Sequence, residues 1–298
     1  MTRCGYCGRD NELGAEVCSG CGTPIGVPPI LNSQVAAPGE AAPPIIDPPQ
    51  LTAGRAALIF LLTFVAQVLG SAFVTVIAFV RKGIGGADLH QPDQIAEITR
   101  TVQPAAFICA AVLGIIVMLG SALLLVRRDL KERSPVGAAW AFGSVKNIAG
   151  GFGLGLVTAV IFSAIVAPFA HSIHPKLGPL TDMSLTRGAP QLAWIFLALF
   201  LAPAPEELLF RGVLYGGFRR SFGATKAAIL ITAIFVLLHI TEWSRFLPGV
   251  LGITGLGLLT LWLRVRTKAI GPAIAAHLGY NGIIVLNTVL FTLFNLDK

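Results

Sequence analysis

The sequence predicts an all-α polytopic membrane protein that is preceded by a small cysteine-rich module. Of its 298 residues, 54% are hydrophobic and only 12% are charged, whereas a soluble domain carries about 25% charged residues. Several apolar runs exceed the roughly 18 residues that mark a membrane-spanning helix. Two Cys-x-x-Cys pairs precede these runs, and a stretch rich in proline and alanine separates them from the first run.

Residues 1–23 form the cysteine-rich module. Cys4 and Cys7 make one pair, Cys18 and Cys21 make the other, and ten residues lie between the pairs. Four thiolates in two such pairs are typical of a tetrahedral Zn²⁺ site, so we expect a zinc ribbon. The zinc would be structural, because four cysteines leave no coordination position open. Two disulfides are the alternative, and they would require an oxidising compartment.

The rest of the chain divides into a linker and a transmembrane domain. Residues 24–50 are rich in Pro and Ala, which favours extended chain, and we expect a semi-rigid linker there. Residues 51–298 form the transmembrane domain, with seven helical spans or, if one is split, eight. Helices are expected because they satisfy the backbone in lipid and the apolar runs do not alternate. The expected spans are 56–80, 105–126, 148–169, 191–218, 225–241, 247–263 and 270–293.

Three local features refine this arrangement. Residues 81–104 are polar, so we expect a loop there. Pro203 and Pro205 fall inside the fourth span, where we expect a break or a kink. Glycine-rich stretches at 150–155 and 252–257 would allow close packing of helices.

Basic residues at the ends of the spans predict the orientation. Segments on the side of the N-terminus carry 12 Lys and Arg residues, and those on the other side carry 7. Because such an excess marks the cytoplasmic side, we expect a multi-pass cell-membrane protein with a cytoplasmic N-terminus. The module would then lie in a reducing compartment and could bind a cytoplasmic partner. The net charge of +7 is accounted for by contacts with the lipid bilayer, so we expect no nucleic-acid partner.

Polar residues in the last four spans are the candidate functional residues. A charged side chain within a span costs roughly 2.5–3.5 kcal/mol, so such residues usually mark a site. Residues four apart share a helix face, so Glu207 can pair with Arg211, while Glu206 is turned about 100° away from Glu207. The residues form three motifs, Glu206-Glu207-x-x-x-Arg211, Phe235-x-x-x-His239 and His277-x-x-x-Asn281.

The positions of these motifs predict that they meet at one depth. Each of three polar residues lies 13 positions from the basic residue at the end of its span: Glu206 from Arg219, His239 from Lys226 and Asn281 from Lys268. At about 1.5 Å per residue, this corresponds to roughly 20 Å. Three helices would therefore bring polar groups to one level. A hydrolytic site or a proton- or ion-coupled transporter could use such groups.

With its three motifs in this order, the segment 190–294 resembles the intramembrane CAAX-protease and bacteriocin-processing (CPBP) family, whose relatives include the type II CAAX prenyl endopeptidases. The resemblance implies a catalytic core of a glutamate-type protease that hydrolyses a peptide bond of a membrane-associated protein or peptide without a catalytic metal. It further implies that Glu206 is the general base, that His239 assists it, and that His277 and Asn281 stabilise the oxyanion.

The remaining motif residues would support this chemistry, and several alternatives stay open. Glu207 and Arg211 are expected to be structural or to position Glu206, and Phe235 completes the second motif. Two His and a Glu could instead bind a catalytic Zn²⁺. A non-proteolytic membrane scaffold or regulator of the same fold is a further alternative. In a transporter we would expect polar residues in several spans, and the first three spans of this sequence contain few. The substrate is not identified by the sequence.

Overall fold

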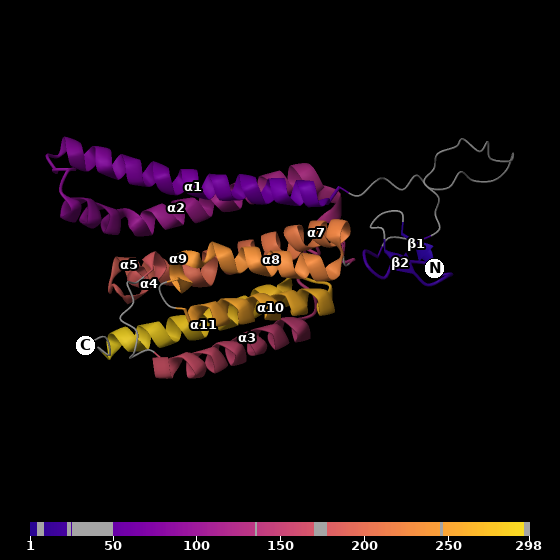
Figure 1. Cartoon of the computed structure of the whole chain (residues 1–298). Coiled ribbons are helices and arrows are strands. Elements are labelled where there is room, and N and C mark those ends of the chain that lie inside the picture. The colour runs from indigo at the N-terminus through magenta and orange to yellow at the C-terminus, as the bar shows by residue number, and fades with distance from the viewer. Residues whose placement is uncertain are drawn as a thin grey trace.

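A computed structural model of the chain describes residues 1–4, 9–22, 25, 50–134, 136–169, 178–244 and 247–294. Most of the expected linker lies outside these ranges. Figure 1 shows that the described chain is mainly helical, as the sequence predicts. The strands found in the described part are β1 (Thr2–Arg3) and β2 (Asp10–Asn11), which pair antiparallel in the N-terminal module.

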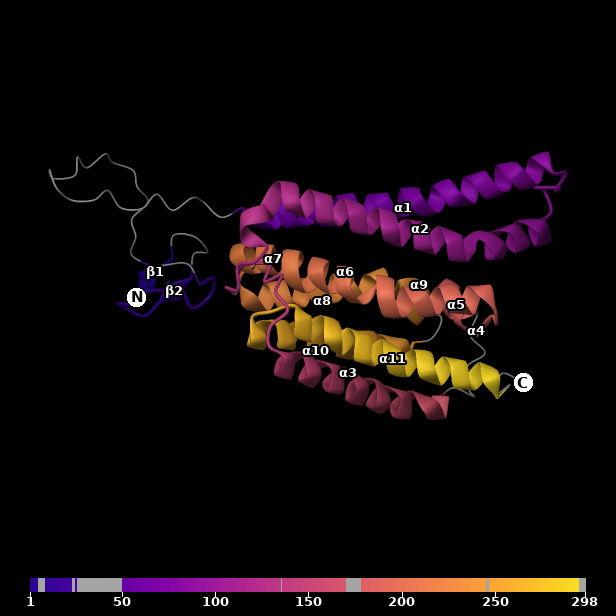
Figure 2. The same ribbon diagram turned by 180° about the vertical axis from the view of Figure 1, so that it is seen from behind.

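The helices pack in three layers, which Figures 1 and 2 show from opposite sides. The first layer is the hairpin of α1 (Ala53–Ile84) and α2 (Pro92–Val126). The third contains α3 (Val145–Val166), α10 (Gly249–Thr267) and α11 (Gly271–Leu293). The central layer holds α8 (Ala224–Leu238) and one continuous helical stretch. That stretch consists of α5 (Ala189–Phe196), η3 (Leu197–Leu201), α6 (Pro203–Glu207), η4 (Leu208–Leu214) and α7 (Tyr215–Phe222).

Short elements connect the layers. The helices α4 (Pro179–Leu185) and α9 (Ile240–Trp243) lie at the end of the domain that is opposite to α7 (Figure 1). Two 3₁₀ turns, η1 (Arg127–Asp129) and η2 (Ala167–Phe169), follow α2 and α3. The segments η3 and η4 are π-helical.

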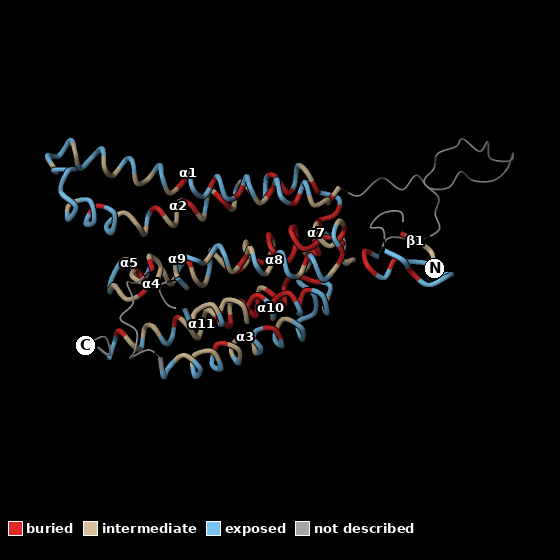
Figure 3. The backbone as a smooth tube through the Cα atoms, in the orientation of Figure 1, coloured by how far each residue is buried: buried red, intermediate tan, exposed pale blue. Residues whose placement is uncertain are grey.

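Within the described residues, six helical stretches are long and apolar enough to cross a membrane. Seven spans were expected, and the difference lies at 225–241. That segment is α8, whose 15 residues measure about 22 Å, less than the hydrocarbon core of about 30 Å. The outward faces of the long helices carry exposed apolar side chains, such as Phe73 at 65% exposure. Figure 3 shows these exposed faces along α1 and α2, and a large exposed apolar surface of this kind is typical of contact with lipid.

The prediction of a loop at 81–104 is wrong, because this segment is largely helical. Helix α1 continues to Ile84, and α2 begins at Pro92, where proline is favoured because its φ is already helical. The polarity of the segment marks the point where the chain leaves lipid rather than the point where the helix ends. With 32 and 35 residues, the two helices are each roughly 50 Å long. The hairpin therefore extends beyond the other helices (Figure 1).

Small residues set the close packing of α3 against α11. A Cβ atom at Gly151 would clash with the carbonyl of Pro272, and one at Gly155 would clash with the carbonyl of Ala276. Only glycine permits this approach, as the glycine-rich stretch 150–155 predicts. Helix α11 is thereby held in place between α3 and the central layer.

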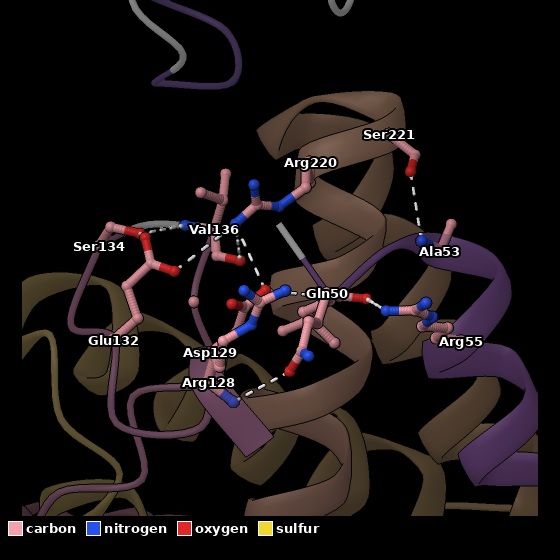
Figure 4. Close-up of polar contacts among 12 residues, drawn as sticks. Gln50, Ala53, Arg55, Arg128, Asp129, Glu132, Ser134, Val136, Arg220 and Ser221 are labelled. Carbon is pink, nitrogen blue, oxygen red and sulfur yellow. Dashed lines mark hydrogen bonds and ion pairs between the residues drawn. The ribbon is translucent and has the colours of Figure 1, made fainter. Parts of the chain in front are cut away.

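Buried charges also occur at the end of the domain where α1 begins (Figure 4). Arg220 Nη2 on α7 lies 3.9 Å from Asp129 and 3.6 Å from Glu132. The same nitrogen donates to the carbonyl of Val136 at 3.4 Å. Asp129 also accepts the N–H of Leu51 at 2.5 Å. We call Asp129, Glu132 and Arg220 the end cluster.

The end cluster is surrounded by contacts that fix the start of α1. The N–H of Ala53 donates to Ser221 Oγ at 3.3 Å. The N–H of Arg128 donates to the side-chain oxygen of Gln50 at 3.1 Å. These contacts hold the beginning of α1 against the ends of α2 and α7 (Figure 4).

Candidate functional site

The N-terminal module brings three of its four cysteines together. The Sγ atoms of Cys4, Cys18 and Cys21 all lie within 4.8 Å of one another, and those of Cys4 and Cys21 are 3.6 Å apart. A disulfide needs about 2.05 Å, so these two sulfurs are not bonded. Sulfurs on a tetrahedral Zn²⁺, each about 2.3 Å from the ion, would be about 3.8 Å apart. The three cysteines can therefore hold a metal ion. Cys7, the fourth expected ligand, lies outside the described residues.

The central helix departs from α-helical geometry on both sides of the acidic pair. Glu206 and Glu207 lie at the end of α6, between the π-helical segments η3 and η4. Two prolines stand just before them, and a break or kink was expected there. The helix is not broken there but continues through widened π-helical turns, which are often found at functional sites.

Glu207 lies at the centre of a chain of buried polar contacts. Its Oε2 is 3.3 Å from Arg211 Nε, and the two side chains are 0% and 1% exposed. This is the pairing that the spacing of four residues predicts. Its Oε1 lies 2.9 Å from Nδ1 of His277 on α11, a contact that the sequence did not indicate. Because an ionised carboxylate only accepts, His277 donates from Nδ1. Its Nε2 is then 4.0 Å from Oε2 of Glu206.

Arg211 connects this chain to two further helices. Its Nη2 donates to the carbonyl of Gly257 on α10 at 3.1 Å. Its guanidinium carbon lies 4.3 Å from the ring centroid of Phe235 on α8. A Cβ at Gly257 would come within 3.3 Å of Arg211 Nη2, so the glycine gives the guanidinium its room. The glycine-rich stretch at 252–257 thus takes part in the site.

His239 is oriented by the backbone of its own helix. Its Nδ1 lies 2.8 Å from the carbonyl oxygen of Phe235. A carbonyl only accepts, so Nδ1 carries the hydrogen and Nε2 of the neutral ring has a free lone pair. The buried ring of Phe235 lies 4.9 Å from the ring of His239 and 6.4 Å from that of His277, between centroids. Phe235 therefore packs against both histidines.

The four candidate catalytic residues line one cavity of about 200 Å³ between the central layer and the helices α10 and α11. We call it the polar cavity. These residues are Glu206, His239, His277 and Asn281. A second cavity of about 270 Å³ lies on the opposite side of α6, against α1 and α2. We call it the apolar cavity. Glu206 and His239 line both cavities, so the two cavities meet at these side chains.

Residues 188–283 match the family model of the type II CAAX prenyl endopeptidase Rce1-like proteins. This segment belongs to the Rce1-like family. The match contains all three motifs and the whole continuous helix of the central layer, and it identifies the segment as that of a membrane protease. It also confirms the resemblance that the motifs indicated. No curated protein and no solved structure matches the chain significantly.

Within the Rce1-like segment, Asn281 compensates for an irregularity of the central helix. The N–H of Ala202 donates to the carbonyl of Leu197 at 2.9 Å, and Pro203 has no N–H to donate. Ala202 and Pro203 are the residues four and five positions after Ala198. The carbonyl of Ala198 therefore receives no hydrogen bond from either of them. Asn281 Nδ2 donates to that carbonyl instead, at 2.8 Å. Its second amide hydrogen remains available for the cavity.

A short helix covers the site at the end opposite to the end cluster. Leu180 on α4 lines both cavities. The carboxylate of Glu242 accepts the N–H groups of Leu180 and Thr181, at 3.1 and 3.2 Å. These bonds cap the beginning of α4, so Glu242 holds α4 over the Rce1-like site. Glu242 follows the FxxxH motif by three residues, but its sequence position alone gives no sign of this partner.

Proposed function

We propose that this protein is an intramembrane endopeptidase of the glutamate type, which hydrolyses a peptide bond in a membrane-associated protein or peptide. The observation that carries the proposal is the convergence of Glu206, His239, His277 and Asn281 on one cavity. The four side chains come from α6, the end of α8 and α11, and they are the set that the three sequence motifs predict.

In this proposal Glu206 is the general base. Its side chain is 29% exposed, whereas that of Glu207 is fully buried. Its Oε2 makes no hydrogen bond with the described residues, and the side chain lines the polar cavity, so the carboxylate is not held by a protein donor and can bind a water molecule there. Glu206 would take a proton from that water, and the oxygen of the water would bond to the carbonyl carbon of the substrate. The same carboxyl group would then give the proton to the leaving amine as the C–N bond breaks.

The two histidines and the asparagine would act on the water and on the carbonyl oxygen. The free lone pair of His239 Nε2 can accept a hydrogen bond from the water and orient it. The second amide hydrogen of Asn281 is one donor for the developing oxyanion. His277 is the other donor when its ring is protonated, because Nε2 then carries a hydrogen in addition to the one on Nδ1. Losing one such donor typically lowers the rate by about 10²–10³.

Glu207 and Arg211 are proposed to orient His277 rather than Glu206. The bond from His277 Nδ1 to Glu207 fixes the ring, in the way that a buried carboxylate orients the histidine of a catalytic triad. Arg211 balances the charge of Glu207. The pair would therefore act on the reaction only through the histidine.

A zinc-dependent metalloprotease is the alternative with the same residues. Among the described residues, only the three cysteines of the N-terminal module bring three metal-binding atoms within 4.8 Å of one another. Glu206, His239 and His277 are spread more widely, which favours a reaction without a catalytic metal. Activity that is lost to a chelator in protein carrying Cys18→Ser, and that Zn²⁺ restores, would favour the alternative.

We also propose that the module binds Zn²⁺ and that the N-terminus is cytoplasmic. The distance between the sulfurs of Cys4 and Cys21 supports zinc. The excess of Lys and Arg on the side of the N-terminus supports the orientation. A cytoplasmic protein is the class of partner that such a module could bind.

The test of the proposed function compares protein termini in membranes from cells that produce the wild type or Glu206→Gln. The substitution keeps the shape of the side chain and removes the base. We expect a set of termini that is present with the wild type and absent with Glu206→Gln and with His239→Ala, at equal protein levels. If no terminus depends on Glu206 while deletion of the whole protein has a phenotype, the scaffold alternative replaces the protease.

A further inference from the structure

The apolar cavity lies directly beside the proposed general base. It is bounded by α1 and α2, which lie outside the Rce1-like match. It opens onto Glu206 and His239, the two polar residues among those that it shares with the polar cavity. Large apolar side chains form most of its lining, among them Phe60, Phe64, Ile115, Met118, Leu209 and Phe210.

Gln67 supplies an amide to this apolar lining. It is an exposed residue of α1, and it makes no hydrogen bond with the described residues. Thr63, which also lines the cavity, donates to the carbonyl of Ile59 at 2.7 Å and is therefore already bonded. An amide in the middle of a membrane span needs a partner, because lipid offers none.

Gln67 and Glu206 lie at the same depth. Helix α1 begins beside the end of α7, where the N–H of Ala53 donates to Ser221 Oγ. Counted from this contact, Gln67 is 14 residues along α1 and Glu206 is 15 residues back along the central helix. At about 1.5 Å per residue, the two side chains lie roughly 21 and 22 Å from the contact. The amide is thus level with the proposed base.

Helix α2 leaves room for the amide. A Cβ atom at Gly114 would lie 2.6 Å from Gln67 Cγ and 2.9 Å from its Nε2. Glycine at this position lets the side chain of Gln67 lie between α1 and α2. A larger residue at 114 would displace the amide and fill part of the cavity.

We propose that the apolar cavity is the substrate subsite next to the scissile bond, and that Gln67 binds the peptide backbone there. This inference rests on the proposed protease function. A segment cut within the membrane is extended, so its N–H and C=O groups lose their helical partners. The amide of Gln67 can accept from one such group and donate to another. The apolar lining then selects the neighbouring side chain of the substrate.

The size of the cavity indicates one bulky apolar side chain as its occupant. Its volume of about 270 Å³ is below the roughly 300–1,000 Å³ of pockets that hold drug-sized ligands. A single aliphatic or aromatic side chain suits this space better than a whole lipid. One methylene group in such a pocket changes the rate by about 10–200-fold, so we expect at least a 10-fold preference for Leu, Met or Phe over Ala.

The first stage of the test uses the termini that depend on Glu206. The residues on both sides of each cut are tabulated for the wild type, and we expect bulky apolar residues at one flanking position. The same measurement is made with Gly114→Leu and with the matched variant Gly120→Leu. Gly120 lies on the same helix, and a Cβ there meets no atom within 4 Å. We expect Gly114→Leu to shift the preference to Ala or Gly and Gly120→Leu to leave it unchanged.

The second stage uses a peptide that contains one mapped cleavage site, in proteoliposomes. Gln67→Leu should raise KM about 5-fold with little change in kcat, because one hydrogen bond to the bound peptide is lost. Val68→Leu, at the neighbouring residue, which is 51% exposed, should leave both constants unchanged.

Three results would overturn the inference. Wild-type cuts without a preference at either flanking position would show that the cavity does not select a side chain. Equal slowing of all substrates by Gly114→Leu would indicate a structural role or a lipid in the cavity. A complete absence of termini that depend on Glu206 would refute the proposed protease and this inference with it, whereas the first two results leave the protease standing.

Discussion

The described chain contains two clusters of paired charges, and the two clusters differ in what their carboxylates face. In the end cluster, Asp129 and Arg220 are 10% and 9% exposed, and Asp129 is bonded to a backbone N–H as well as paired with the arginine. In the site, Glu207 is similarly enclosed by Arg211 and His277. Glu206 differs from Asp129 and Glu207, because its side chain is 29% exposed and lines two cavities. Glu132 of the end cluster is 38% exposed but lines neither of these cavities.

This difference separates charges that hold the fold from a charge that is free to react. A buried ion pair is stable only when further hydrogen bonds satisfy its atoms. Asp129 accepts the Leu51 N–H beside its pair with Arg220, and Glu207 contacts His277 beside its pair with Arg211. The two arginines lie on the same continuous helix. Glu206 lies next to Glu207 in the sequence, yet its Oε2 is 4.0 Å from His277 Nε2 and its side chain lines both cavities. We interpret Glu206 as reactive and the other carboxylates as structural or orienting.

The largest effect is expected when Glu206 is changed. Glu206→Gln removes the proposed base, and general-base catalysis typically contributes about 10²–10⁴ in rate. We expect cleavage of a mapped substrate peptide in proteoliposomes to fall by at least 100-fold. A rate within 10-fold of the wild type would remove the distinction between Glu206 and the enclosed carboxylates.

Arg211→Met should have the largest effect on stability. It would leave Glu207 buried without its cation, which typically costs about 3–5 kcal/mol. The midpoint of thermal unfolding in detergent should fall strongly. The double variant Glu207→Leu with Arg211→Met should recover much of this loss, because no charge is left unpaired, but it should not recover activity. Recovery of both would show that Glu207 does not orient His277.

Asn281→Ala should lower the rate by about 10²–10³, because one oxyanion donor is lost. The matched variant is Asn287→Ala on the same helix, where the amide donates to Ser163 Oγ at 3.0 Å. Cleavage assays on both variants at equal folded protein check this prediction. Equal cleavage rates for the two variants would show that Asn281 only binds the carbonyl of Ala198 and does not stabilise the oxyanion.

Asp129→Asn tests the end cluster. The substitution weakens the pair with Arg220 and the bond to the Leu51 N–H, which should destabilise the fold by about 1–3 kcal/mol. A lower midpoint of thermal unfolding is the expected result. An unchanged midpoint would mean that the end cluster does not hold the start of α1.

The smallest effect on cleavage is expected in the N-terminal module. Cys18→Ser removes one of the three sulfurs that lie together, so bound metal should fall from about one Zn²⁺ per chain to nearly none. Mass spectrometry of the metal in purified protein measures this change. The cleavage rate of a peptide in proteoliposomes should stay within about 2-fold of the wild type, since the loss of a structural zinc does not alter Glu206.

The sequence predicted which polar residues lie together better than it predicted the contacts among them. A charged residue in an apolar run is a strong signal, because lipid makes it costly, and the three motifs were found in this way. The spacing of four residues also predicted the pair of Glu207 and Arg211. It could not predict that Glu207 binds His277, because helical periodicity describes one helix and does not say which helix is its neighbour.

The fold differs from the sequence-based prediction at 81–104 and in the central helix, and both differences have physical causes. The polarity of 81–104 shows where the chain leaves lipid, but a helix can continue into water, and α1 and α2 do so. Two prolines predicted a break or a kink in the central helix, and the helix is not broken, because π-helical turns and the bond from Asn281 to Ala198 keep it continuous. The second outcome depends on Asn281, which is distant from Ala198 in the sequence.

One paired measurement tests the comparison most directly. Purified Glu206→Gln and Asp129→Asn are assayed together for thermal unfolding and for the rate of peptide cleavage per folded molecule. We predict that Glu206→Gln keeps the wild-type midpoint and loses cleavage, whereas Asp129→Asn lowers the midpoint and keeps the rate per folded molecule. The opposite pattern, with cleavage retained by Glu206→Gln and lost by folded Asp129→Asn, would contradict the assignment of the reaction to Glu206.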